Sequence, residues 1–191
     1  MTQSGLRHIP QLLGWDAFTH SRMSALKLFL LYAAPLSFVP PIMIYYAGVT
    51  YGGQLLPVLK VTQLEGIGIV FYVAELVMTF VIAYVIQRLS ELVDIKPAFA
   101  DAYKLAVVIP TPLWLAPLFL FIPSFMLNLT AGAAALIFSG MLIFYSVPPI
   151  LGIEERGRAM LLSGSILAAG MVAWATMMYL TLLFWSFDTS L

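Results

Sequence analysis

Residues 64–88 read LEGIGIVFYVAELVMTFVIAYVIQR, and this stretch establishes the fold class of the chain. A transmembrane helix needs about 20 mostly apolar residues, because each residue adds about 1.5 Å and the hydrocarbon core of a bilayer is roughly 30 Å thick. The strand of a membrane barrel is much shorter, at about 9–11 residues. The stretch therefore predicts a helix that spans a membrane, with Glu75 near its middle.

The composition extends this prediction to the whole chain. Of its 191 residues, 62% are hydrophobic and 9% are charged, whereas a soluble domain carries about 45–50% apolar and ~25% charged residues. Nine Lys and Arg balance nine Asp and Glu, which leaves no basic surface for nucleic acid. Cysteine is absent, so disulfides and thiolate chemistry are excluded. We expect an all-α integral membrane protein without a soluble domain.

Proline, glycine and charged residues divide the apolar sequence into segments that are long enough to span a bilayer. We predict five transmembrane helices, at residues 25–49, 64–88, 101–123, 125–149 and 159–186. Almost nothing separates the third segment from the fourth, which predicts a tight helical hairpin. The domain prediction has three parts: a cytoplasmic N-terminal segment, a five-span membrane domain and an external tail, at residues 1–24, 25–186 and 187–191.

Residues 6–19 mix apolar and polar positions, and two interpretations stay open. Leu6, Ile9 and Leu13 could share one face of a short helix that lies on the cytoplasmic leaflet. Pro10 and Gly14 favour an unstructured tail instead. We favour the interfacial helix, because neighbouring arginines would meet anionic head groups.

The distribution of cations predicts the orientation of the chain. Eight of the nine Lys and Arg residues fall on one side of a five-span topology, and Lys60 falls on the other. Short cytoplasmic loops carry an excess of Lys and Arg, so we expect the N-terminus in the cytoplasm. We also expect an interfacial ion pair between Asp101 and Lys104. The residues expected to contact lipid head groups are Arg22, Lys104, Arg156 and Arg158.

Sequence signatures of enzymes are missing from the chain. It contains no phosphate-binding G-x-x-x-x-G-K-[ST], no H-E-x-x-H and no G-x-S-x-G. Its histidines, His8 and His20, both precede the first predicted span, so no histidine is available for a haem site or a proton relay at membrane depth. We therefore predict no catalytic residue, no cofactor and no metal site.

Glu75 is the candidate polar residue within the membrane. It lies thirteen residues from Arg88, which is about 20 Å at helical rise. An ionised group at this depth costs roughly 2.5–3.5 kcal/mol, so a neutral carboxyl group is the expected state. One interpretation is a proton- or cation-linked site, and the other is a neutral hydrogen-bond clamp between helices. The lack of a histidine or cationic partner favours the clamp.

The third predicted span contains the sequence IPTPLWLAP at residues 109–117, which predicts a helix broken by proline. Each interior proline removes one donor and frees the carbonyl four residues earlier, and in hydrocarbon that carbonyl needs a donor from the protein. Thr111 lies at a depth similar to that of Glu75. We hypothesise that Glu75 donates to Thr111 or to a freed carbonyl of residues 106–113. The candidate intramembrane site is therefore Glu75, Thr111, Pro110 and Pro112.

Several short stretches resemble the Yip1 family. They are DAYK at 101–104, TPLWL at 111–115, IP at 122–123 and YSVPP at 145–149. The predicted five-span layout is also similar to that of this family, over roughly residues 20–186. Thr111, Pro112 and Pro123 match the family's motif, and we interpret them as structural residues.

The resemblance implies a non-enzymatic membrane protein. Eukaryotic members act in vesicle traffic, bind Rab-type GTPases and one another through cytoplasmic parts, and help to shape membranes. Since the first predicted span begins near residue 25, we expect this chain to lack their long N-terminal extension, and we do not carry GTPase binding over to it. It looks more like the compact bacterial members, which places it in the inner membrane with a periplasmic C-terminus.

Two functions follow from these predictions. The preferred one is a scaffold or adaptor in membrane organisation, or a small accessory subunit of a larger membrane complex. Its partners would be lipids and other membrane protein subunits, or further copies of itself. The alternative is a carrier of small solutes or ions that uses Glu75 and the broken third span.

Overall fold

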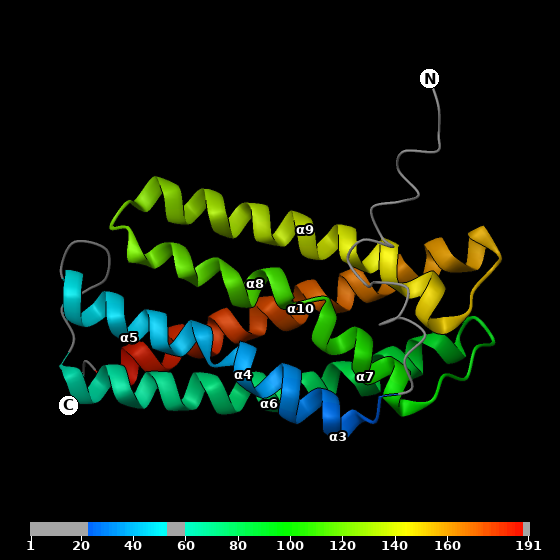
Figure 1. Ribbon diagram of the computed structural model, residues 1–191, viewed down its shortest axis with the longest axis horizontal. Coiled ribbons are helices and arrows are strands. Elements are labelled where there is room, and N and C mark those ends of the chain that lie inside the picture. The colour runs from blue at the N-terminus through cyan, green and yellow to red at the C-terminus, as the bar shows by residue number, and fades with distance from the viewer. Residues whose placement is uncertain (1–22, 53–59, 189–191) are drawn as a thin grey trace.

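The computed structural model describes residues 23–52 and 60–188, and this part of the chain is helical, without strands (Figure 1). Five stretches are long and apolar enough to cross a membrane: Ala25–Tyr51, Val61–Glu91, Phe99–Phe121, Phe125–Leu151 and Arg156–Thr181. The predicted all-α fold class and the five predicted spans are confirmed. The predicted interfacial helix at residues 6–19 lies outside the described residues.

The first span is a series of short helices. It comprises α3 (Ala25–Leu28), a π-helical turn (Phe29–Ala33), α4 (Ala34–Ser37) and α5 (Val39–Tyr51). The Ser24 hydroxyl accepts a hydrogen bond from the Lys27 backbone N–H at 3.3 Å and caps the start. Prolines follow at 35, 40 and 41, and a proline cannot donate to the helical hydrogen-bond ladder. The irregular helix follows from these prolines.

The second span is one continuous helix, α6 (Val61–Glu91), of 31 residues. At helical rise it is about 46 Å long, which exceeds the hydrocarbon core of a bilayer. It packs against α5, α7 and α10 and so forms one wall of the bundle. Glu75 lies near the middle of this helix, as the sequence predicts.

The third span consists of α7 (Phe99–Val108), a turn at residues 109–110, α8 (Thr111–Leu115) and a 3₁₀ helix, η2 (Ala116–Phe121). Pro112 and Pro117 each occupy the second position of a new helical segment. Proline is tolerated in a first turn because the N–H groups there have no partner within the helix. All seven residues from 102 to 108 are buried, which places α7 in the core of the bundle.

The fourth and fifth spans are α9 (Phe125–Leu151) and α10 (Arg156–Asp188). Three residues separate η2 from α9, so the predicted hairpin between the third and fourth spans is confirmed. Gly152 ends α9 in the left-handed conformation at φ 65°, where a glycine has no steric penalty. α9 packs against α7, α8, η2 and α10.

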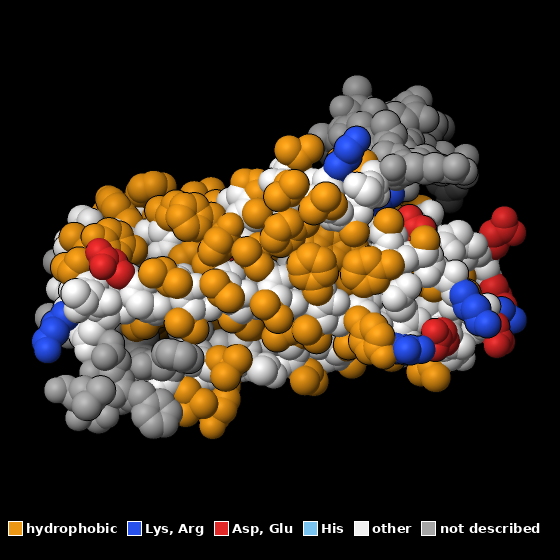
Figure 2. Space-filling view, turned by 90° about the horizontal axis from the view of Figure 1, so that it is seen from below, with side chains coloured by type: hydrophobic (Ala, Val, Ile, Leu, Met, Phe, Trp, Pro, Cys, Tyr) orange, Lys and Arg blue, Asp and Glu red, His pale blue; other side chains and the backbone are white. Residues whose placement is uncertain are grey.

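Charge is concentrated at the two ends of the molecule, and apolar side chains cover the surface between them (Figure 2). Within the described residues, one end holds Lys60 and Glu65 at the start of α6. The other end holds the end of α6, the start of α7 and the connection from α9 to α10. Cations that lie toward this second end are Lys27, Arg88, Lys96, Lys104, Arg156 and Arg158.

Candidate functional site

A cavity of about 650 Å³ lies within the bundle, and residues from all five spans line it. Its walls are mainly apolar, with Phe71 and Glu75 from α6 and Trp114 from α8. α9 and α10 meet toward the end of the molecule where α10 begins, and they separate toward the other end (Figure 1). Leu129 on α9 and Met171 on α10 line the cavity and are exposed. The cavity therefore opens to the surface between these two helices.

Glu75 is the ionisable side chain among the residues that line this cavity. The indole N–H of Trp114 hydrogen-bonds to its carboxyl group. The second carboxyl oxygen, Oε2, is buried without a hydrogen-bond partner in the described part of the chain, and so is the hydroxyl of Ser139 on α9. Both Glu75 and Ser139 line the cavity. Buried polar atoms are normally hydrogen-bonded, so these two atoms give the cavity polar groups that are free to bind, and we treat it as the candidate site.

The hypothesised hydrogen bond between Glu75 and Thr111 was wrong. Thr111 Oγ1 lies 2.8 Å from the Tyr32 hydroxyl of the first span and donates to the Val107 carbonyl at 3.2 Å. The proline-rich stretch therefore receives a hydrogen-bond donor from the Thr111 hydroxyl, and not from the Glu75 carboxyl group. Pro110 lines the cavity next to Glu75, whereas Thr111 and Pro112 do not.

Tyrosine hydroxyls make interhelical contacts that sequence reasoning missed. Tyr72 of α6 donates to the Ala34 carbonyl at 3.1 Å, next to the break between α4 and α5. Tyr103 of α7 lies 3.1 Å from the Thr79 hydroxyl of α6, and both residues are buried. Both tyrosines lie within spans, whereas tyrosines that anchor a span at the membrane interface lie at its ends. This position in the sequence could have indicated interhelical hydrogen bonds.

The expected role of Lys104 at the lipid head groups was also wrong. Its side chain is 1% exposed, because α7 is enclosed by its neighbours along the whole stretch from 102 to 108. Arg156 and Arg158 are exposed in the first turn of α10. Arg158 pairs with Glu155 at 2.8 Å. Arg22 lies outside the described residues.

Trp114 is buried within the bundle, whereas Trp174 on α10 lines the cavity and is 36% exposed. The described residues offer no group of three or more His, Cys, Asp or Glu side chains that could hold a metal ion. The polar chemistry of the cavity is therefore that of one carboxyl group, two indoles, one amide and a few hydroxyl groups.

Comparison with known proteins gives a family for this architecture. The chain is 26% identical over 132 residues to "Inner membrane protein YohC" of Escherichia coli K12, which covers 68% of this chain and 67% of the relative. The protein of the same name from Escherichia coli O6:H1 strain CFT073 gives the same values. No solved structure matches the chain. Residues 13–177 match the Yip1 domain family model. Since this match covers most of the five-span domain, the chain belongs to the Yip1 family.

Proposed function

We propose that this protein is a non-enzymatic scaffold or small accessory subunit that assembles with a partner helix in the bacterial inner membrane. Membership of the Yip1 family and the similarity to an inner membrane protein support this proposal. The partner is a second copy of the chain or another membrane protein. The proposed orientation has a cytoplasmic N-terminus and follows from the cation distribution.

The observation that carries the proposal is a face of small residues on α10 that no other span covers. Ala168 and Ala175 are exposed, and a side chain added at Gly164 would meet nothing within 4 Å. Small residues let two transmembrane helices approach closely, so an open face of this kind suits a partner helix. The similar residues Ala135 and Ser139 on α9 are already buried inside the bundle. Gly132 and Ala133 on α9 are also open, but they line the cavity, so we assign the face on α10 to a partner.

The apolar cavity favours this role over transport of small hydrophilic solutes or ions. Carriers of such solutes bind them with polar side chains and unwound backbone near the bilayer midplane. Here the wall around Glu75 consists mostly of aliphatic, aromatic and methionine side chains. A hydrated ion would lose its water there and gain few replacement ligands.

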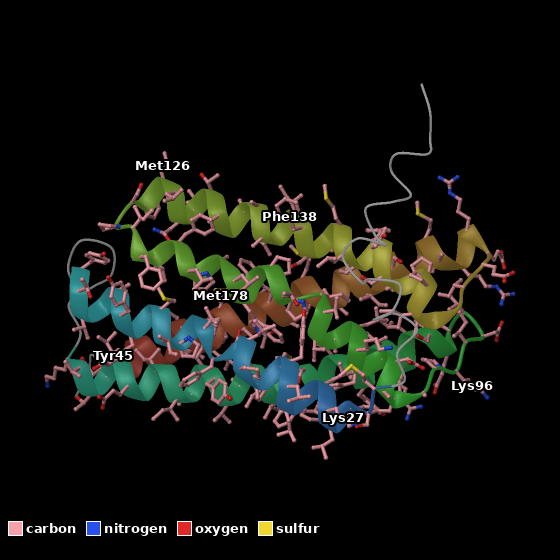
Figure 3. All side chains as sticks on the ribbon, in the orientation of Figure 1. Lys27, Tyr45, Lys96, Met126, Phe138 and Met178 are labelled. Carbon is pink, nitrogen blue, oxygen red and sulfur yellow. The ribbon has the colours of Figure 1, made fainter. Side chains whose placement is uncertain are left out.

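Site-specific photo-cross-linking in cells tests the proposal. The cross-linker replaces Val172 on α10, which is 67% exposed beside the small residues. The matched control replaces Phe138, which is 58% exposed on α9 and points away from the other helices (Figure 3). We expect a discrete protein adduct from position 172, identified by mass spectrometry, and only lipid adducts from position 138.

The scaffold proposal also predicts a stoichiometric companion, or a defined oligomer, after native purification. Only lipid adducts at both positions, with a monomer that moves solute across liposomes, would contradict the proposal. An adduct with a second copy and one with a different protein both support assembly, and they identify the partner.

A further inference from the structure

Glu75 places a potential negative charge in an apolar cavity that contains no cationic side chain. No Lys, Arg or His is among the described residues that line the cavity, and the indole of Trp114 satisfies only part of the carboxyl group. A buried carboxylate is strongly stabilised by an opposite charge nearby. The described part of the protein offers none at the cavity, so the carboxyl group stays neutral until a cationic ligand supplies the opposite charge.

Aromatic rings and methionine sulfurs line the same cavity as this carboxyl group. Trp114, Trp174 and Phe71 all line the cavity. The faces of such rings attract cations, and tryptophan does so best. Methionine side chains are flexible and polarisable, which suits ligands of varied shape. The methionines that line the cavity are Met78, Met171, Met177 and Met178.

We propose that this cavity binds a lipophilic organic cation, with Glu75 as the counter-charge and the two indoles as ring contacts. The volume of about 650 Å³ falls within the range of roughly 300–1,000 Å³ that is typical of pockets for drug-sized molecules. The ligand enters from the bilayer, since the cavity opens between α9 and α10. This proposal concerns binding and is independent of the partner proposed for α10.

The apolar walls restrict the class of cation. A compact ion such as Na⁺ or a simple ammonium keeps a tightly held water shell, and the few hydroxyl groups of the cavity cannot replace it. A cation whose charge is shielded by or spread over apolar groups loses little hydration on entry. It gains contact with the apolar walls in addition to the charge pair. Lipophilic phosphonium and quaternary ammonium compounds have this chemistry.

A pair of probes with the same shape and opposite charge tests the proposal. Tetraphenylphosphonium and tetraphenylborate are titrated by calorimetry into the full chain in nonionic detergent, with empty micelles as the blank. The variant is Glu75→Gln, which keeps the size and the polarity of the side chain. The matched control is Glu65→Gln, an exposed carboxyl group on the same helix that does not line the cavity.

We expect saturable 1:1 binding of the phosphonium and none of the borate. Glu75→Gln should weaken phosphonium binding by about tenfold or more, the scale of one partly desolvated charge pair. Glu65→Gln should leave the binding unchanged. Trp174→Leu should weaken it by about two- to fivefold through loss of a cation–π contact.

Two results would overturn the proposal. Equal binding of both probes would mean that the cavity holds apolar groups without regard to charge, as a lipid tail would require. Unchanged phosphonium binding in Glu75→Gln would remove the carboxyl group from the site. If Glu75→Gln does not fold, the comparison of the two probes on the wild-type chain and on Trp174→Leu decides the question, because both use folded protein.

Discussion

The hydrogen bond between Tyr32 and Thr111 joins the first span to the third through two side chains, at 2.8 Å. We predict that Tyr32→Phe and Thr111→Val each destabilise the protein. A double-mutant cycle should give a coupling of about 0.6 kcal/mol and at most about 1.7 kcal/mol, the mean and the maximum measured for interhelical hydrogen bonds in a membrane protein. The measurement is the free energy of unfolding in mixed micelles. Thr111→Val also removes the hydrogen bond to the Val107 carbonyl.

Tyr179→Phe is the matched control for this cycle. Tyr179 is 61% exposed on α10 and has no hydrogen bond among the described contacts. Removal of its hydroxyl should leave the free energy of unfolding unchanged. If the losses in free energy of unfolding from Tyr32→Phe and Thr111→Val are strictly additive, the coupling is zero. That result would contradict a stabilising hydrogen bond between the two side chains.

At the residue scale, the sequence identified unusual polar side chains within the spans, but it did not predict which of them are in contact. Glu75 stands out because an acid within an apolar span is unusual. Its partner could not be predicted, because depth gives the position along a span and not the rotation about its axis. Both Thr111 and Trp114 lie on α8, yet Trp114 interacts with Glu75 whereas Thr111 meets Tyr32. Lys104 was misjudged for a different reason, because α7 is buried on all faces from residue 102 to 108 and no rotation about its axis would expose the side chain.

At the scale of elements, α5 and α6 pack closely where Gly48 meets Leu64. A Cβ atom added at Gly48 would lie 2.7 Å from both terminal carbons of Leu64, which is 2% exposed, so this buried side chain would have to shift. We predict that Gly48→Ala destabilises the protein by about 1–3 kcal/mol, the usual effect of overpacking. The loss should appear as a lower free energy of unfolding in micelles.

Two further variants separate overpacking from other effects at this contact. Gly66→Ala on α6 adds the same methyl group where nothing lies within 4 Å, so we expect no loss of stability. In the double variant Gly48→Ala/Leu64→Ala, the new methyl group should occupy part of the space vacated by leucine. The double variant should therefore lose less free energy of unfolding than the sum of the losses in the two single variants. Strict additivity would contradict a direct contact.

The existence of the helices could be predicted from sequence far better than their packing. Length and hydrophobicity gave five spans, since a bilayer sets both. Burial could not be predicted in the same way. In a soluble protein an apolar face indicates the core, but here α7 is enclosed whereas Val73 and Val77 of α6 are more than half exposed, and both helices are apolar. Lipid and protein interior favour the same residues, so the usual periodicity carries no signal.

For the whole molecule, the remaining question is which end faces the cytoplasm. Cations gather at the end that contains the connection from α9 to α10, and Lys60 lies at the other end, so the first end should be cytoplasmic. The chain contains no cysteine, which makes single-cysteine labelling unambiguous. The exposed residues Glu65 and Glu154 lie at opposite ends. In cells with a permeable outer membrane, an impermeant maleimide should label Glu65→Cys directly and Glu154→Cys only after the inner membrane is disrupted. The reverse pattern would invert the proposed topology. It would also place the connection from α9 to α10 in the periplasm, leaving the five-span fold and the cavity unchanged.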